Sequence, residues 1–307
     1  MATTTVSPAT VSYAALALLT MDFDLAQLRA LSATVAEGSF DAAARALHVT
    51  PSAVSQRIKA LESAVGSVLV QRSKPVAVTE SGQAVLRLAR QIDILAADAQ
   101  RGLGDTGDRP VGIPIAVNAD SLATWILPAL AGLADAPSFD IHLDDQEHTT
   151  TLLRSGTVMA AITAVARPIQ GCSSTLLGTM RYRPRCSAPF ADAWFAEGVT
   201  RDALDRAPVV VFDRKDELQD TYLRQAARPR PNPPRHYVPS SGDFVRSVEL
   251  GLGWGNVPDL QDTPELVVFD PDYVVDVPLY WQQWQLQSPT LERVAAAVRA
   301  AAAQHLR

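Results

Sequence analysis

Apolar residues recur at helical spacing near the start of the chain. They mark three amphipathic segments, one with Leu25, Leu28, Leu31 and Val35, one with Phe40, Ala43, Ala44 and Leu47, and one with Val54, Ile58 and Leu61. Ser39 precedes the second segment, and Thr50 followed by Pro51 precedes the third. A hydroxyl oxygen at such a position accepts a free backbone N–H, and proline fits the first helical position. The run from Ser39 to Gly66, SFDAAARALHVTPSAVSQRIKALESAVG, therefore predicts a helix-turn-helix.

The second helix of this pair has a polar face beside its apolar stripe. Its candidate DNA-contacting residues are Pro51, Ser52, Ala53, Ser55, Gln56 and Lys59. Hydroxyl and amide groups read the edges of bases, whereas lysine and arginine hold phosphates, so a recognition helix needs this arrangement. An ordinary helical hairpin with a solvated polar face has the same pattern, and the spacing alone does not separate the two.

Two short β-branched runs follow within VLVQRSKPVAVTES, residues 68–81. They flank the turn from Arg72 to Pro75, which carries Arg72 and Lys74. This pattern predicts a hairpin, or wing, that places both cations against the DNA backbone. Three helices followed by such a hairpin indicate a winged helix-turn-helix over residues 22–80.

A long helix is predicted over residues 81–103. Its apolar residues Val85, Leu88, Ile92, Leu95 and Ala99 step by three and four positions, which is the spacing of a coiled-coil seam. Roughly two heptads are fewer than a free-standing coiled coil needs, so packing against its own domain is the alternative. Glycine, aspartate and proline in residues 104–110 predict a hinge and a domain boundary.

Strand and helix patterns alternate from residue 111 to the end of the chain. Strands are predicted over residues 113–117, 139–143, 158–163 and 208–213, with helices between them. Repeated β-α units imply parallel sheets with ligand sites at the carboxyl ends of the strands. The sequence contains no glycine-rich phosphate loop, HExxH, GxSxG or CxxC motif, and its five histidines have no metal-ligand spacing. An enzyme that resembles a binding protein would need a catalytic constellation, and the sequence offers none.

Polar and acidic residues follow three of these strands. The candidate effector-binding residues are Asn118, Asp120, Ser121, Trp125, Asp144, Asp145, Glu147 and Asp213. Asp120 or Ser121 can cap a helix whose free N–H groups hold a carboxylate, while the acidic groups surround a cation. Such a pair of subsites suits a basic amino acid. A solvated acidic loop and an ordinary helix cap are the alternative.

Charge is distributed unevenly along the 307 residues, whose formal net charge is −6. Residues 22–80 contain six Lys or Arg and six Asp or Glu residues, and the acidic excess lies after residue 110. A neutral DNA-binding domain holds phosphates weakly as a monomer, so we expect a homodimer or tetramer. No metal or cofactor is expected. Two cysteines are too few for a disulfide framework and indicate reduced thiols in the cytoplasm.

The first 20 residues carry no charge, so they lack the basic start of a signal peptide. Residues 1–21 are therefore expected to form a disordered extension. No apolar run approaches the 18 residues that a transmembrane helix requires, and no contact with a membrane is expected.

The chain from about Met21 resembles the LysR-type transcriptional regulators. The resemblance rests on the helix-turn-helix run, on LVQR at residues 69–72 and on VTESG at residues 78–82. It implies an all-α winged helix-turn-helix with a long linker helix that pairs two copies. It also implies a C-terminal α/β effector domain, residues 111–307, similar to periplasmic binding proteins. One lobe would comprise about residues 111–183 and 279–307, and the other about residues 184–278.

Four further runs resemble the lysine- and arginine-responsive branch of that family. They are NADSLATW at 118–125, GVTRDAL at 198–204, APVVVFDR at 207–214 and PLYWQQW at 278–284. The resemblance implies L-lysine or L-arginine as effector and control of an amino-acid exporter gene. Where that branch has a run like GMIPHLQ, this chain has GWGNVPDLQ at 253–261, so Trp254 and Asn256 are expected to alter the cleft or its closure. A ligand-insensitive origin-binding or nucleoid-associated protein is the alternative.

Overall fold

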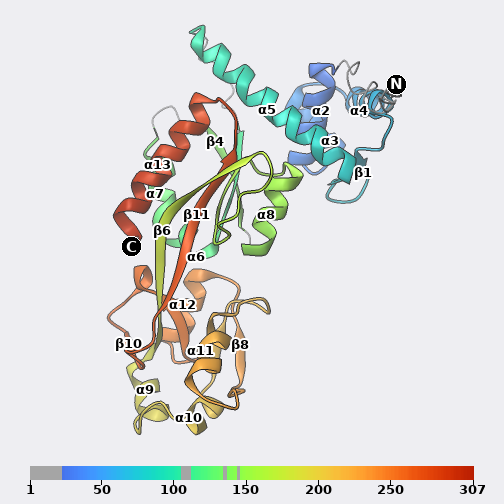
Figure 1. Ribbon diagram of the computed structural model, residues 1–307. Helices are drawn as coiled ribbons and strands as arrows, with labels where there is room; N and C mark the ends of the chain where they lie inside the picture. The colour runs from blue at the N-terminus through green and yellow to red at the C-terminus, as the bar shows by residue number, and fades with distance from the viewer. Residues whose placement is uncertain (1–22, 105–111, 134–136, 144–145) are drawn as a thin grey trace, which may run out of the picture. The chain divides into compact units, whose positions relative to one another are not determined.

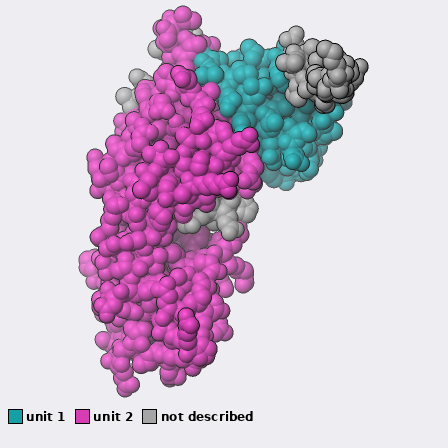
Figure 2. All heavy atoms as spheres, viewed as in Figure 1, with its two compact units in different colours: residues 1–97, 155–157 teal, residues 98–154, 158–307 magenta. Residues whose placement is uncertain are grey.

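The computed structural model describes residues 23–104, 112–133, 137–143 and 146–307. It divides into two compact units, residues 1–97 with 155–157 and residues 98–154 with 158–307 (Figure 2). The predicted extension over residues 1–21, most of the predicted hinge, and Asp144 and Asp145 lie outside the described residues. In the part of the chain that the structure describes, no helix is both long and apolar enough to cross a bilayer.

The first unit consists of helices and one small hairpin (Figure 1). Its elements are α2 (Leu25–Ala36), α3 (Phe40–Leu47), α4 (Pro51–Val65), β1 (Val70–Gln71) and β2 (Ala77–Val78), and α5 (Glu80–Gly102) begins in it. The strands are antiparallel, with Val70 opposite Val78. The predicted helix-turn-helix and wing are both present.

The ends of α3 and α4 are set by local chemistry that the sequence predicted. Ser39 Oγ accepts a hydrogen bond from the Ala42 backbone N–H at 3.2 Å, and Thr50 Oγ1 accepts one from Ala53 at 3.2 Å. Between the helices His48 adopts a left-handed conformation with a φ of 53°, which turns the chain. Both predicted N-caps are confirmed.

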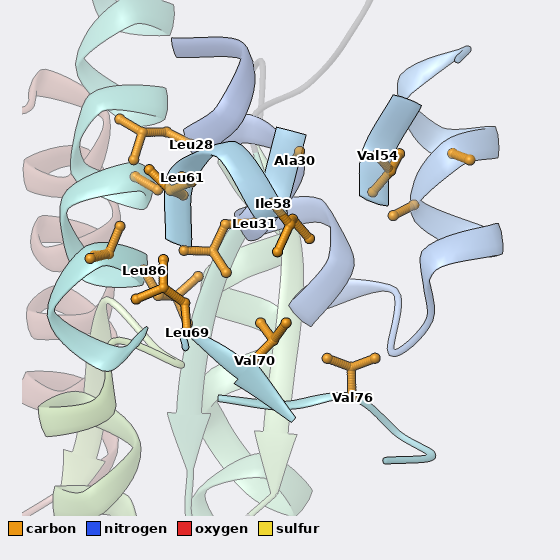
Figure 3. Close-up of a cluster of buried hydrophobic side chains, with 14 residues drawn as sticks. Leu28, Ala30, Leu31, Val54, Ile58, Leu61, Leu69, Val70, Val76 and Leu86 are labelled. Carbon is orange, nitrogen blue, oxygen red and sulfur yellow. The ribbon is translucent and has the colours of Figure 1, made fainter. Parts of the chain in front are cut away.

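The core of the first unit joins α2, α3, α4, the hairpin and the start of α5 (Figure 3). Leu31, Val54 and Leu61 are completely buried in it, as the helical pattern predicts. Leu25 is an exception: it belongs to the same apolar pattern but is 51% exposed, because it lies in the first turn of α2.

Helix α5 uses part of the predicted seam for its own domain. Val85 is buried in the core of the first unit, and Ile92 packs against that core. Leu95 and Ala99 are exposed. The beginning of α5 thus packs against its own domain, which was the alternative to a coiled-coil seam. Toward the end of α5, apolar side chains of the predicted seam remain exposed.

The second unit is built on a seven-stranded mixed sheet. Its strand order is β10-β6-β11-β5-β3-β4, and β9 also pairs with β6. The strands are β3 (Gly112–Val117), β4 (Ser138–Leu143), β5 (Ala160–Thr163), β6 (Cys172–Ser187), β9 (Gly255–Pro258), β10 (Leu266–Val268) and β11 (Val275–Trp284). Strand β3 is parallel to β4 and β5, whereas β6 is antiparallel to β9, β10 and β11. Strand β11 is also antiparallel to β5, so the predicted parallel arrangement holds for two of the six strand pairings and is wrong for the other four.

Helices and a smaller sheet complete the second unit. They are α6 (Ala119–Ser121), a π-helical turn (Leu122–Ile126), α7 (Leu127–Ala131), α8 (Gln146–Ser155), α9 (Ala188–Trp194), α10 (Arg201–Arg206), β7 (Val209–Val211), α11 (Leu218–Ala226), β8 (Arg235–Tyr237), α12 (Ser241–Glu249), the 3-10 turn η2 (Asp259–Gln261) and α13 (Pro289–His305). Figure 1 shows β6 and β11 running from the part that contains α13 to the part that contains α9 and β10. Two lobes joined by long strands fit a fold like that of periplasmic binding proteins.

Candidate functional site

Helix α4 presents the predicted polar face to solvent. Ser52, Gln56 and Lys59 are exposed, as is Pro51, while Ala53 and Ser55 are half-buried. On the opposite side Val54, Ile58 and Leu61 are buried. A helix with one side fixed in a core and a short polar side free can enter the major groove of DNA.

The wing is attached to α4 by a carboxylate. Glu62 Oε1 accepts hydrogen bonds from the backbone N–H groups of Leu69, at 2.9 Å, and Val70, at 3.4 Å. These bonds fix the first strand of the hairpin against the helix. The turn of the hairpin carries Arg72 and Lys74, and both are exposed, as a phosphate contact requires.

Arg72 also contacts the helix-turn-helix itself. Its Nη2 donates a hydrogen bond to Ser55 Oγ at 3.2 Å, and its guanidinium lies over the Phe40 ring, 5.0 Å from the centroid. The sequence reasoning gave Arg72 only a backbone contact and Ser55 only a base contact. The structure adds a link between the wing and the recognition helix, through which one cation is held in place.

The VTESG run joins the wing to α5. Thr79 Oγ1 accepts a hydrogen bond from the Gly82 N–H at 3.0 Å, and the Thr79 N–H donates to the Leu69 carbonyl at 3.0 Å. Gly82 is buried, and a side chain there would collide with the Leu69 carbonyl oxygen and with Val78 Cγ1 at 2.7 Å. Glycine is therefore required for α5 to lie this close to the hairpin.

The predicted effector residues after β3 lie in an irregular helical segment. Asn118 occupies the N-cap position but makes no side-chain cap hydrogen bond, and a π-helical turn follows from Leu122. The expectation that Asp120 or Ser121 caps this helix is wrong, since both lie within its first turn. Asn118 Oδ1 and Ser121 Oγ are instead buried without a hydrogen-bond partner. Trp125, also predicted, is fully buried, and its indole N–H likewise has no partner.

Asp120 lies where three elements meet. Its Oδ2 accepts a hydrogen bond from the Tyr182 hydroxyl of β6 at 2.7 Å, and its Oδ1 accepts one from Ser241 Oγ of α12 at 2.6 Å. Burial raises the pKa of Tyr182 well above its usual value, and the Asp120 charge adds to that rise. The tyrosine therefore stays a hydrogen-bond donor to the carboxylate. This tertiary role explains why Asp120 does not act as a cap.

Ser241 is held from a second side by the turn η2. Its hydroxyl lies 3.0 Å from Gln261 Oε1. The same turn carries Asp259, whose carboxylate binds Arg183 at 3.2 Å and Arg185 at 2.9 Å, both from β6. The turn that contacts Ser241 is thereby tied to the long strand that carries Tyr182.

The predicted effector residue Asp213 lies in a turn together with a second aspartate, Asp216. Asp213 Oδ1 accepts hydrogen bonds from the backbone of Lys215, at 2.8 Å, and of Asp216, at 3.0 Å, so it shapes a turn. The Asp216 carboxylate accepts hydrogen bonds from the backbone of Phe212 and Leu218. Burial raises the pKa of Asp216, and the charges of Asp120 and Asp213 contribute to the same rise. The sequence analysis named Asp213 and missed Asp216, although both aspartates are half-buried.

Trp254 and Asn256, the two departures from the family pattern, are both buried. Trp254 lies in an aromatic core, with its ring centroid 5.2 Å from that of Tyr222 and 5.5 Å from that of Phe269. Asn256, two residues later, is buried, and its Nδ2 donates to the Leu218 carbonyl at 3.1 Å. Of the two residues that depart from the family pattern, Trp254 is therefore part of the core, and Asn256 is a buried polar residue linked to Asp216 through Leu218.

The remaining candidates contribute less. Asp144 and Asp145 fall outside the described residues, and Glu147 lies in α8 with a side chain that is not described. Burial raises the pKa of the Cys186 thiol to about 12, so it is protonated at neutral pH. Among the residues whose structure is described, no three His, Cys, Asp or Glu side chains gather as metal ligands would.

Comparisons with known proteins identify the family. Residues 25–83 match the family described as "Bacterial regulatory helix-turn-helix protein, lysR family". The HTH-type transcriptional regulator LysG of Mycobacterium tuberculosis is 45% identical over 281 residues, which cover 90% of this chain and 92% of that protein. The lysine export transcriptional regulatory protein LysG of Corynebacterium glutamicum is 40% identical over 92% of this chain and 98% of its own length.

A solved structure supports the same assignment over the whole fold. Full-length LysG from Corynebacterium glutamicum with bound effector Arg superimposes with a TM-score of 0.72 at 37% identity, over 93% of this chain and 100% of that chain. These relatives are transcriptional regulators and not enzymes. The chain belongs to the LysR family of bacterial DNA-binding transcriptional regulators.

Proposed function

We propose that this chain is a cytoplasmic regulator that binds L-lysine or L-arginine and controls an exporter gene for basic amino acids. The contact between Asp120 and Ser241 carries this proposal, because it places a half-buried carboxylate between α6 and α12, and a second half-buried carboxylate, Asp216, lies close enough for the two charges to interact. Paired carboxylates in a buried setting are stabilised by a cationic ligand. The names of the relatives, which include lysine export and bound arginine, point to the same ligand class.

The proposed effector site comprises the predicted residues together with the groups that meet Asp120. Its members are Asn118, Asp120, Ser121, Trp125, Asp144, Asp145, Glu147, Asp213, Tyr182 and Ser241. The unpartnered Ser121 hydroxyl can donate to the carboxylate of an amino acid, and the unpartnered Asn118 Oδ1 can accept from its ammonium group. Buried polar atoms without partners are rare, and a ligand would satisfy these two.

The proposed DNA-contacting residues are Pro51, Ser52, Ala53, Ser55, Gln56, Lys59, Arg72 and Lys74. Gln56 is the exposed amide suited to reading a base edge, whereas Lys59, Arg72 and Lys74 are the exposed cations suited to phosphates. The exposed Leu95, 39% accessible, lies on α5 where two copies of the chain would pair. A homodimer, or a tetramer of two such pairs, would bind two half-sites.

The proposed domain organisation follows from these roles. Residues 22–80 bind DNA, residues 81–103 pair two copies, and residues 111–307 bind the effector between a lobe of residues 111–183 with 279–307 and a lobe of residues 184–278. A ligand shifts an equilibrium only if it binds one arrangement more tightly. An effector that contacts Asp120 from one side and Ser241 from the other would favour one arrangement of the lobes and so alter the DNA-bound state.

A thermal-shift screen of the full chain against the twenty amino acids tests this proposal. Binding to the folded state stabilises it by RT ln(1 + [L]/Kd), so a ligand present well above its Kd raises Tm. We expect lysine, arginine or both to raise Tm and neutral or acidic amino acids to leave it unchanged. A Tm that responds to none of the twenty would contradict an amino-acid effector and would favour ligand-insensitive DNA binding.

A further inference from the structure

Two buried amide side chains close to Asp216 have oxygen atoms without a hydrogen-bond partner. Gln219, on α11, is 1% exposed, and Asn256, on β9, is 2% exposed. Gln219 Oε1 and Asn256 Oδ1 accept no hydrogen bond. Each is an acceptor removed from water and left unsatisfied, which is unfavourable in the unliganded chain.

The orientation of both amides is fixed by their nitrogen atoms. Gln219 Nε2 donates to the Val210 carbonyl and to Asp216 Oδ2, each at 3.2 Å. Asn256 Nδ2 donates to the Leu218 carbonyl at 3.1 Å. Exchanging nitrogen and oxygen would place an oxygen against these acceptors, so the two free atoms are oxygens and need a donor.

The two amides and Asp216 form one group around the first turn of α11. Gln219 contacts the Asp216 carboxylate directly, and Leu218 links the other two members, because its N–H donates to Asp216 Oδ1 at 3.0 Å and its carbonyl accepts from Asn256. Every group of this set that remains available is an acceptor, and Asp120 brings a further negative charge within electrostatic range of Asp216. A ligand that satisfies the set must be rich in donors and positively charged.

We propose that Asp216, Gln219 and Asn256 form the subsite that receives the cationic side-chain end of the effector. A guanidinium offers five N–H donors and an ammonium offers three, and neither has an acceptor to oppose these oxygens. This inference rests on the proposed function and assigns one end of the ligand within it. It gives a role to Asn256, which stands where the chain departs from the pattern of the lysine- and arginine-responsive branch.

Neutral analogues of the ligands test this assignment. L-citrulline has the shape of L-arginine, but its side chain carries a carbonyl oxygen in place of one nitrogen group of the guanidinium and is uncharged. Isothermal titration calorimetry gives the ratio of the Kd for citrulline to the Kd for arginine, and the same can be done with L-norleucine and L-lysine. Because the α-amino and carboxylate groups are shared within each pair, the ratio reports only on the side-chain end.

The variant Asn256→Leu removes the free amide oxygen from the proposed subsite, and Asp216→Asn removes its carboxylate charge. We expect each to weaken arginine binding by about 10- to 100-fold, the effect of losing a hydrogen bond to a charged group, and to leave citrulline binding little changed. The ratio should therefore fall toward one. Two independent variants guard against a failure of either to fold, which thermal denaturation would reveal. Glu217→Gln is the matched control, since Glu217 adjoins Asp216 but is exposed and should keep the wild-type ratio.

The possible outcomes distinguish a failure of the subsite from a failure of the proposed function. If the wild-type chain discriminates arginine from citrulline and both variants keep that ratio, the subsite is wrong while the effector class stands. Equal losses for arginine and citrulline would place the α-amino group there and would also overturn the assignment. If the wild-type chain binds neither lysine nor arginine, the proposed function and the subsite both fail.

Discussion

The carboxylate of Asp120 and the hydroxyl of Ser241 form a hydrogen bond of 2.6 Å between residues that lie 121 positions apart in the chain. Asp120 follows the parallel strand β3, and Ser241 begins α12, so the bond joins the two predicted lobes. The Tyr182 hydroxyl holds the other oxygen of the same carboxylate at 2.7 Å. A ligand that binds at Asp120 therefore acts on a contact that spans the effector domain.

Replacing this carboxylate should weaken effector binding. We expect Asp120→Asn to lower the affinity for L-arginine by about 10-fold or more, because a hydrogen bond to a charged group contributes about 1.5–3 kcal/mol. Calorimetry on the full chain measures the change. Asp202→Asn removes a carboxylate that is 82% exposed on α10 and serves as the control. Equal affinities for the wild type and Asp120→Asn would remove Asp120 from the site.

The raised pKa of Asp216 makes a prediction for stability against pH. The carboxyl proton of Asp216 is bound more tightly in the folded chain than in the unfolded chain. Its contribution to the free energy of unfolding is therefore full below the ordinary carboxyl pKa of 3.8, and it is lost as pH rises through the raised pKa of Asp216 in the folded chain. The loss is about 1.4 kcal/mol for each unit by which burial raises the pKa. Asp216→Asn cannot titrate and lacks this dependence.

Urea denaturation of the wild type and of Asp216→Asn at several pH values checks the direction of this change in stability. The difference in unfolding free energy, wild type minus Asp216→Asn, should decrease from about pH 4 to about pH 7. A difference that grows as pH rises would mean that the Asp216 carboxylate is stabilised in its charged form, contrary to the burial described above.

Gly82 should tolerate no side chain. In Gly82→Ala the new methyl group would collide with the Leu69 carbonyl oxygen and lie 2.7 Å from Val78 Cγ1, so α5 must move away from the hairpin. We expect a loss of about 3 kcal/mol in the unfolding free energy of the DNA-binding domain and weaker DNA binding. Gly102→Ala, on the same helix with open space around it, should be neutral or slightly stabilising. Equal stability of the two variants would contradict the close approach.

The contact between Arg72 and Ser55 should appear as a coupling energy. Arg72→Ala should weaken binding to all DNA sequences and reduce the salt slope by about one, as for a lost phosphate contact. A double-mutant cycle with Ser55→Ala should give a coupling of about 0.5–1 kcal/mol, because the two side chains share a hydrogen bond at 3.2 Å. Lys74→Ala should lower the slope without coupling to Ser55. Additive effects of Arg72 and Ser55 would mean that they act separately on DNA.

The sequence correctly predicted the features that depend on residues close together in the chain. Ser39, Thr50 and the buried stripe of α4 depend on contacts within a few positions, and each was correct. Strand β6 was missed although apolar residues alternate with three arginines in its second half, because its 16 residues also contain a glycine and a proline, which are typical of turns. The wrong cap at Asp120 has a similar cause. Local rules favour an N-cap there, but Tyr182 and Ser241, distant in sequence, bind the carboxylate instead.

The candidate site was predictable in kind but not in detail. Asp213 was expected to end a buried strand, but β7 ends at Val211 and Asp213 shapes the turn that follows, while the carboxylate whose pKa burial raises is Asp216. Nothing in the local pattern distinguishes these two aspartates, because the hydrogen bonds of Asp216 to Phe212, Leu218 and Gln219 depend on how the chain folds around the start of α11. Asn256 did leave a signal, as it interrupts the pattern shared by similar sequences, whereas Gln219, the other buried amide, left none.

Footprinting on the intergenic DNA beside the chain's own gene tests regulation by a basic amino acid most directly. The purified full-length chain is compared alone, with L-arginine, with L-lysine and with the neutral analogues L-citrulline and L-norleucine. We predict a sequence-specific footprint whose protected region changes with arginine, lysine or both and does not change with the analogues. A footprint that is the same under all five conditions, or uniform protection without sequence preference, would contradict an effector-gated regulator.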